Sequence, residues 1–263
     1  MRFCPQCGEE RLRPGDLGMR DLSAQLVKNA SSIDGKLVRS WRGLLTRPGQ
    51  LTAAYISGER RRTLSPLALF FIANAIFVGV QLLTGVNILS SPLDSHLHFQ
   101  DWSPFVQGLV EDRLASRGLT LDAYAPVFDR SAVFNAKALI ILMALAFAPM
   151  AAITFRDHRP AGSHIIFALH LYAFILVLLS GSVLLAELDL LLGGGGLRSA
   201  NVDKALSIFN LLICGSYLYL AIPKVYSTAG WRRVASAMLL TLGIGLLFVG
   251  YRFAIFLITF YTT

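Results

Sequence analysis

Charged residues are scarce in this 263-residue chain. Lys, Arg, Asp and Glu make up 15% of it, whereas hydrophobic residues make up 54%. A soluble domain of this size carries about a quarter charged residues, so the composition argues against an ordinary soluble enzyme. Cysteine is also rare, at three residues, and this excludes a small secreted fold held together by disulfides.

Recognisable catalytic motifs are missing as well. The chain has no HExxH zinc-protease motif and no GxSxG nucleophile elbow. The glycines at 193–196 are not followed by the Lys and Ser or Thr of a phosphate-binding loop. No Asp or Glu lies in the middle of a long apolar run. These absences predict a protein that is not an enzyme, and they disfavour a proton or cation relay built from carboxylates.

Long apolar runs dominate what is present. Each is long enough, at a rise of about 1.5 Å per residue, to cross a hydrocarbon core of about 30 Å. Backbone groups have no water partners there, so each run is expected to be helical. The sequence therefore predicts an all-α polytopic membrane helix bundle with about five transmembrane helices. The expected spans are Pro66–Leu89, Val133–Phe155, His164–Leu192, Ala205–Ile222 and Val234–Thr259.

Charge is distributed unevenly between the loops. Residues 1–63 carry twelve Lys or Arg against six Asp or Glu, whereas loop 90–132 carries three basic and six acidic residues. Short loops rich in Lys and Arg stay in the cytoplasm. We therefore expect a cytoplasmic amino terminus and an outer carboxyl terminus. The net charge of +8 is interpreted as attraction to anionic lipid headgroups, and not as a nucleic-acid-binding surface.

Three regions follow from these patterns. Residues 1–18 form half of a zinc-ribbon knuckle, 19–63 form cytoplasmic amphipathic helices, and 64–263 form the membrane bundle with an outer helical loop at 90–132. The amphipathic region fits a helix lying in the membrane interface, with Trp41 at headgroup level. It fits equally a helix packed against the cytoplasmic ends of the spans.

Cys4 and Cys7 form a CxxCG knuckle of the kind that holds zinc through two thiolates on a turn. Structural zinc takes four ligands, and no second pair occurs in the amino-terminal region. The third cysteine, Cys214, lies inside a predicted span. One chain thus offers half a site. Either two chains share one zinc ion in a homodimer, or the knuckle binds no metal.

A second, weaker metal motif lies in the outer loop. His96 and His98 form an HxH pair beside Asp94 and Asp101. Imidazole and carboxylate groups in this spacing occur at metal sites, but they are more common as solvated loop residues.

Polar residues inside the spans are costly and therefore mark possible functional sites. The functional interpretation is a shared polar site formed by Asn74, His170, Asn210 and Arg252. The structural interpretation is that these side chains make hydrogen bonds between helices, with Arg252 reaching outward to water. The sequence favours the structural interpretation.

Small residues recur at every fourth position of the fifth span, at Ala237, Thr241 and Gly245. This spacing lets another helix approach closely. The partner helix belongs either to the same chain or to a second copy.

Several segments occur in an order that resembles a known group of proteins. They are residues 4–8 (CPQCG), 45–49 (LTRPG), 55–60 (YISGER), Ser65-Pro66 and 164–174 (HIIFALHLYAF). Together they resemble an uncharacterised bacterial family of zinc-ribbon-tagged integral membrane proteins. Members of that family carry two cysteine knuckles, whereas this chain has one. The five-span plan is also similar to the Yip family of membrane trafficking and shaping proteins.

The resemblance implies a multi-pass protein of the bacterial inner membrane. Together with the missing catalytic motifs, it favours a non-enzymatic scaffold or adaptor that recruits an unidentified protein partner through its basic cytoplasmic segment. A small transporter or channel that uses the intramembrane polar residues is the second hypothesis. A membrane enzyme is the third.

Overall fold

A computed structural model describes residues 35–156 and 159–263. Every regular element in these ranges is helical. Residues 35–46 form the first described helical segment. The remaining elements are α2 (Gln50–Ile56), α3 (Pro66–Thr84), α4 (Leu93–His98), α5 (Ser103–Arg117), α6 (Leu121–Ala138), α7 (Ile141–Phe155), α8 (Ala161–Leu191), the 3-10 turn η2 (Gly196–Arg198), α9 (Ala200–Tyr226) and α10 (Gly230–Thr262).

Four of the described helices, α3, α8, α9 and α10, are long and apolar enough to cross a membrane. A fifth crossing results if α6 and α7, which meet at an angle of 52°, are counted as one bent span. The expectation of an all-α bundle with about five helices able to span a membrane is thereby confirmed. The expected start of the first span is also confirmed, because the Ser65 side chain accepts from the Ala68 N–H and Pro66 is the first helical residue.

The predicted second span, Val133–Phe155, is wrong as a single straight helix. The chain breaks at residues 139–140, and α7 alone is 15 residues long, or about 22 Å. Partners on α10 accommodate the break: the Tyr251 hydroxyl donates to the Ala136 carbonyl oxygen at 2.7 Å, and Asn135 Nδ2 donates to Thr259 Oγ1 at 3.0 Å. A hydropathy pattern records the length of an apolar run and carries no information about such contacts.

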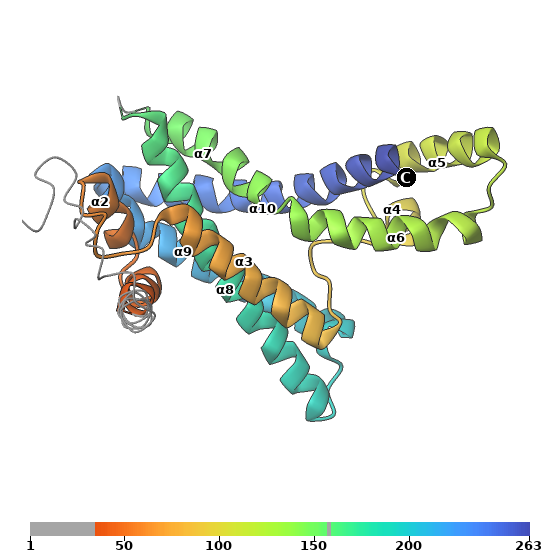
Figure 1. Cartoon of the computed structure of the whole chain (residues 1–263), viewed down its shortest axis with the longest axis horizontal. Helices are drawn as coiled ribbons and strands as arrows, with labels where there is room; N and C mark the ends of the chain where they lie inside the picture. Colours follow the sequence, from red (N-terminus) through yellow and green to blue (C-terminus); the bar gives the residue numbers. More distant parts are fainter. Residues whose placement is uncertain (1–34, 157–158) are drawn as a thin grey trace, which may run out of the picture.

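The helices form a fork (Figure 1). Along one arm, α3 and α9 both pack against α8. Along the other, the C-terminal half of α10 packs against α6 (Figure 1), and its aromatic side chains contact Phe105 and Arg113 of α5. With 33 residues, α10 is about 50 Å long. Its N-terminal half therefore lies in the bundle, and its C-terminal half lies in the second arm. We call α4, α5, α6 and the C-terminal half of α10 the far arm.

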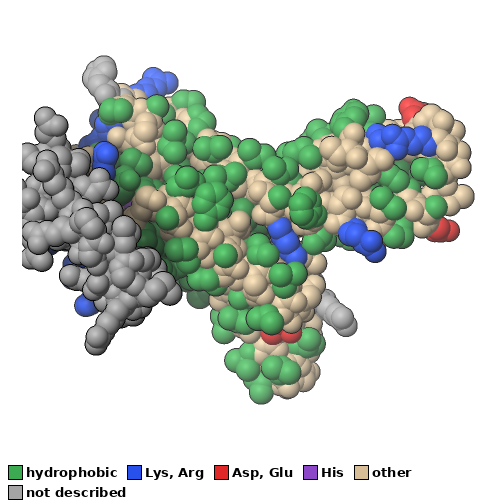
Figure 2. Space-filling view, in the orientation of Figure 1, with side chains coloured by type: hydrophobic (Ala, Val, Ile, Leu, Met, Phe, Trp, Pro, Cys, Tyr) green, Lys and Arg blue, Asp and Glu red, His purple; other side chains and the backbone are tan. Residues whose placement is uncertain are grey.

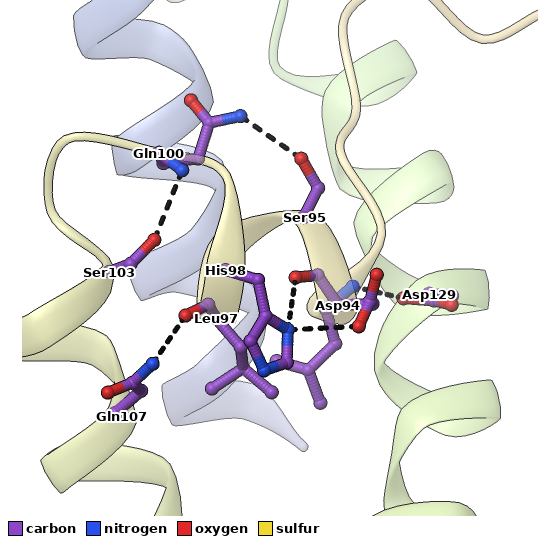
Figure 3. Close-up of polar contacts among 9 residues, drawn as sticks. Asp94, Ser95, Leu97, His98, Gln100, Ser103, Gln107 and Asp129 are labelled. Atoms are coloured by element: carbon purple, nitrogen blue, oxygen red, sulfur yellow. Dashed lines mark hydrogen bonds and ion pairs between the residues drawn. The ribbon is translucent and has the colours of Figure 1, made fainter.

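Loop 90–132 is folded within the far arm. α5 begins at Ser103, and Gly118 with its left-handed backbone ends it. Thr120 caps the 18-residue α6, because its side chain accepts from the Ala123 N–H. Side-chain hydrogen bonds connect the pieces (Figure 3). Asp129 of α6 accepts from the Leu93 N–H at 2.7 Å, and Gln107 of α5 donates to the Leu97 carbonyl at 2.7 Å.

Candidate functional site

The described surface that is richest in Lys and Arg lies at one end of the bundle. The spans α3, α8 and α10 begin at this end, and α9 ends there. Residues 35–63 contain seven Lys or Arg and a single acid, Glu59. We call this segment the basic platform. Basic side chains are visible at this end of the molecule and also on the far arm, whereas the acidic side chains visible in the same view lie only on the two arms (Figure 2). Six of its arginines are exposed to solvent: Arg39, Arg42, Arg47, Arg60, Arg61 and Arg62.

The helix of residues 35–46, which is the first part of the platform, is hydrogen-bonded to the residues just before the first span. Ser40 is fully buried; its hydroxyl donates to the Lys36 carbonyl at 2.8 Å and accepts from the Leu64 N–H at 2.9 Å. Arg39 Nε also donates to the Arg62 carbonyl at 3.1 Å. Residues 23 and 24 positions apart are therefore held side by side, immediately before α3 begins.

A second attachment joins α2 to the spans. Gly49, with φ of +77°, begins α2 so close to α9 that a Cβ atom would lie 2.6 Å from the Ala221 carbonyl oxygen. Thr52 Oγ1 lies 2.9 Å from His170 Nδ1 on α8, and both residues are buried. The Tyr55 ring meets the same imidazole edge-on at 6.4 Å. Contacts to both α8 and α9 thus hold α2 in place.

The four predicted intramembrane polar residues lie at different places. His170 lies beneath α2, as described above. Asn74 lies on α3, and its Oδ1 is buried without a hydrogen-bond partner in the described part of the chain. Asn210 and Arg252 line one cavity of about 590 Å³ between α8, α9 and α10, whereas neither His170 nor Asn74 lines it. The structure therefore brings two of the four together.

The small residues on α10 also divide between two neighbours. A Cβ on Gly215 of α9 would lie 3.2 Å from Thr241 Oγ1, so these two helices approach closely at that point. Ala237 and Thr241 line a shallow groove with Gly215, whereas Gly245 lines the larger cavity. A helix of the same chain is thus the neighbour of Thr241.

The two histidines of loop 90–132, His96 and His98, lie in different environments. His96 is 1% exposed and packs against Phe256 and Phe128, with Trp102 Nε1 donating to its Nδ1 at 3.1 Å. Burial and, to a lesser extent, the charge of Arg252 lower the His96 pKa to about 4. His98 is exposed and lies 3.0 Å from Asp94 (Figure 3). No group of three metal-binding side chains occurs within the described ranges, and Cys4 and Cys7 lie outside them.

Sequence reasoning missed the residues that hold the platform. Ser40 and Thr52 are both buried, and each bonds to a residue that is distant in the sequence. A periodic apolar pattern does not mark such residues, since a serine or threonine in a helix usually bonds to its own backbone. The signal that was available is local: Gly49 follows Pro48 within a stretch of helical periodicity, which indicates a sharp turn that brings α2 back to the bundle.

Comparison with known proteins adds one finding. Residues 34–78 match the family model described as protein of unknown function (DUF3667). No curated protein and no solved structure matches the chain significantly. The matched segment covers the platform and about two-thirds of α3, and it excludes Cys4 and Cys7. The matched segment is thus the part of the chain in which a basic surface is attached to the first helix that could span a membrane.

Proposed function

We propose that this chain is a non-enzymatic adaptor of the bacterial inner membrane. Its basic platform faces the cytoplasm, lies against anionic lipid headgroups and recruits a protein partner with an acidic surface. The observation that carries the proposal is the attachment of the platform to three spans through Ser40, Gly49 and Thr52. A rigid surface of this kind binds without a large ordering cost, in contrast to a loose basic tail.

Charge and exposure support the choice of partner. The segment that carries the six exposed arginines also has exposed apolar side chains, including Val38, which is 65% exposed, and Leu45, which is 45% exposed. Arginine side chains together with exposed apolar groups are typical of protein interfaces. Attraction to anionic lipid headgroups, in contrast, needs only positive charge. The cysteine knuckle, if it joins two chains through one zinc ion, would present two platforms to the same partner.

The test is photo-crosslinking in intact cells from a crosslinking amino acid at Val38. We expect a discrete protein adduct in the wild-type background and several-fold less of it in Arg42→Gln/Arg47→Gln. The matched control, Arg42→Lys/Arg47→Lys, keeps the charge and is expected to retain most of the adduct. Lipid adducts alone in all three backgrounds would refute the adaptor role.

A second function, a small transporter or channel, is favoured by the cavity that Asn210 and Arg252 line. Transport requires a continuous route, and it predicts that Arg252→Gln changes the flux of a substrate through reconstituted vesicles. Equal flux of all small solutes through wild type, variant and protein-free vesicles would eliminate this alternative.

A further inference from the structure

The cavity between α8, α9 and α10 lies in the half of the bundle that is remote from the platform. Its deep end is formed by Ile175 of α8, Cys214 of α9 and Ile244 of α10, and its rim includes Asp203, Arg252 and the segment 86–89. These residues lie in consistent order along the three helices. The cavity therefore extends from the far rim toward the middle of the bundle, between α8 and α9 on one arm of the fork and α10 on the other (Figure 1).

Its polar side chains lie toward the rim and include Asn87, Ser207, Arg252 and Asp203. Ser182 and Asn210 also line it, and Ser182 Oγ donates to Asn210 Oδ1 at 2.7 Å. Most of the remaining wall is aliphatic or aromatic, as exemplified by Leu179, Phe248 and Val249. A polar rim above a long apolar wall is the shape complementary to an amphipathic molecule.

Arg252 is the chemically distinctive group at this rim. Its side chain is exposed, and Nη2 donates to the Ile88 carbonyl at 3.0 Å. A guanidinium has five N–H donors in a planar fork that matches the oxygens of a phosphate. Among the described residues, no carboxylate lies within ion-pair distance of it. Most of its donors therefore remain for a ligand or water.

The depth of Arg252 matches that of a lipid headgroup. Arg232 and Arg252 are 20 positions apart on the same helix, which corresponds to about 30 Å along its axis. This is about the thickness of the hydrocarbon core, so when Arg232 lies at one headgroup boundary Arg252 lies near the other. The apolar wall below Arg252 then lies at the depth of acyl chains. Its volume of about 590 Å³ is within the usual range for ligand pockets.

We propose that this cavity binds a single phospholipid from the leaflet opposite the platform, with the lipid phosphate on Arg252 and one acyl chain along α8, α9 and α10. Asp203 accepts hydrogen bonds from donors on the headgroup, such as the hydroxyls of phosphatidylglycerol. The proposal does not depend on the adaptor function, because the platform and this cavity share no residue.

The experiment is native mass spectrometry of the full-length protein in mild detergent, with phosphatidylglycerol or diacylglycerol of identical chains added. Diacylglycerol lacks the phosphate but fills the same apolar space. We expect one phosphatidylglycerol retained per chain, at least tenfold more strongly than diacylglycerol. Arg252→Gln is expected to remove this preference, while Arg130→Gln, an exposed arginine of α6 that does not line the cavity, leaves it unchanged.

A second pair of variants tests the wall independently of charge. Gly245 lines the cavity and has open space at its Cβ position, so Gly245→Leu fills the cavity without a backbone clash. Gly250 also has open space but does not line the cavity, and Gly250→Leu is the matched control. We expect Gly245→Leu to lose the retained phosphatidylglycerol and Gly250→Leu to keep it.

Three results would overturn the proposal. Equal retention of phosphatidylglycerol and diacylglycerol by the wild type would mean that Arg252 does not bind the phosphate. Unchanged retention in both Arg252→Gln and Gly245→Leu would place the lipid elsewhere. A lipid-free dimer would show that a second copy of the chain covers this cavity.

Discussion

Among single residues, Gly49 has the most demanding position. It combines a left-handed backbone with an approach to α9 that leaves no room for a side chain. Only glycine adopts that backbone conformation at little cost. The position of α2 on the bundle, and with it the Thr52–His170 contact, therefore depends on this residue.

Gly49→Ala is expected to destabilise the protein by about 2–6 kcal/mol, because backbone strain and overpacking each contribute about 1–3 kcal/mol. Thermal unfolding in detergent measures the effect. Gly58→Ala separates the two causes, since Gly58 has a φ of +102° but open space around it, and we expect about 1 kcal/mol there. Equal losses at both positions would contradict the close packing against Ala221.

His96 is expected to make the stability of the far arm depend on pH. Its pKa falls from 6.5 when unfolded to about 4 when folded, so the unfolded chain binds the proton more strongly. Stability is therefore complete above pH 6.5 and declines as the pH falls toward 4, by about 2 kcal/mol at pH 5. Unfolding measured at pH 7.5 and pH 5 tests this.

The control for the histidine prediction compares two substitutions. His96→Gln keeps an acceptor for the Trp102 N–H and removes the titrating group, so the decline between pH 7.5 and pH 5 is expected to shrink. His98→Gln changes an exposed side chain and is expected to leave it in place. A decline that persists unchanged in His96→Gln would refute the assignment.

Sequence reasoning was informative about residue type but not about residue partners. It identified His170, Asn210 and Arg252 as costly to place in a membrane. It did not predict that His170 pairs with Thr52, since 118 positions separate them and no periodicity connects a cytoplasmic helix to a particular face of a span. Whether these residues form a functional site stays a prediction.

Among the elements, the boundary between α6 and α7 determines where the far arm begins. The chain turns by 52° there, and the turn leaves backbone carbonyls without their usual helical donors. The Tyr251 hydroxyl supplies a donor to one of them, on Ala136. Both residues are buried, so this hydrogen bond has no ready replacement by water.

Tyr251→Phe is expected to destabilise the protein by about 1–3 kcal/mol, because it leaves a buried carbonyl unsatisfied. Limited proteolysis of α6, together with thermal unfolding, measures the loss. Tyr261→Phe is the matched control, since Tyr261 is 68% exposed near the end of the same helix. Similar behaviour of the two variants would show that the hydroxyl of Tyr251 does not support the turn.

Element lengths were partly predictable. The apolar runs correctly located α3, α8, α9 and α10, because a membrane-spanning helix must satisfy its own backbone. They failed at the second span, where the chain breaks at residues 139–140. At this break the far arm meets the bundle, and packing against other helices, not membrane thickness, determines where a helix ends.

For the whole molecule, the uneven charge predicts a single orientation, with the platform in the cytoplasm. Ser57 and Ser116 are exposed at opposite ends, so single cysteines at these positions report it when all native cysteines are replaced. A membrane-impermeant maleimide is expected to label Ser116→Cys in intact cells and Ser57→Cys only after permeabilisation. The reverse pattern would contradict the orientation and the proposed cytoplasmic role of the platform.

The dependence of the far arm on α10 has a consequence for biosynthesis. Asn135, Tyr124 and Arg117 bond to residues 124 to 146 positions later in the chain. At synthesis rates of about 5–20 residues per second, α5 and α6 wait on the order of ten seconds for these partners. During that interval Phe128 and His96, both buried in the finished protein, lack the aromatic rings of α10. The nascent chain therefore needs protection on the far side of the membrane before its last helix arrives.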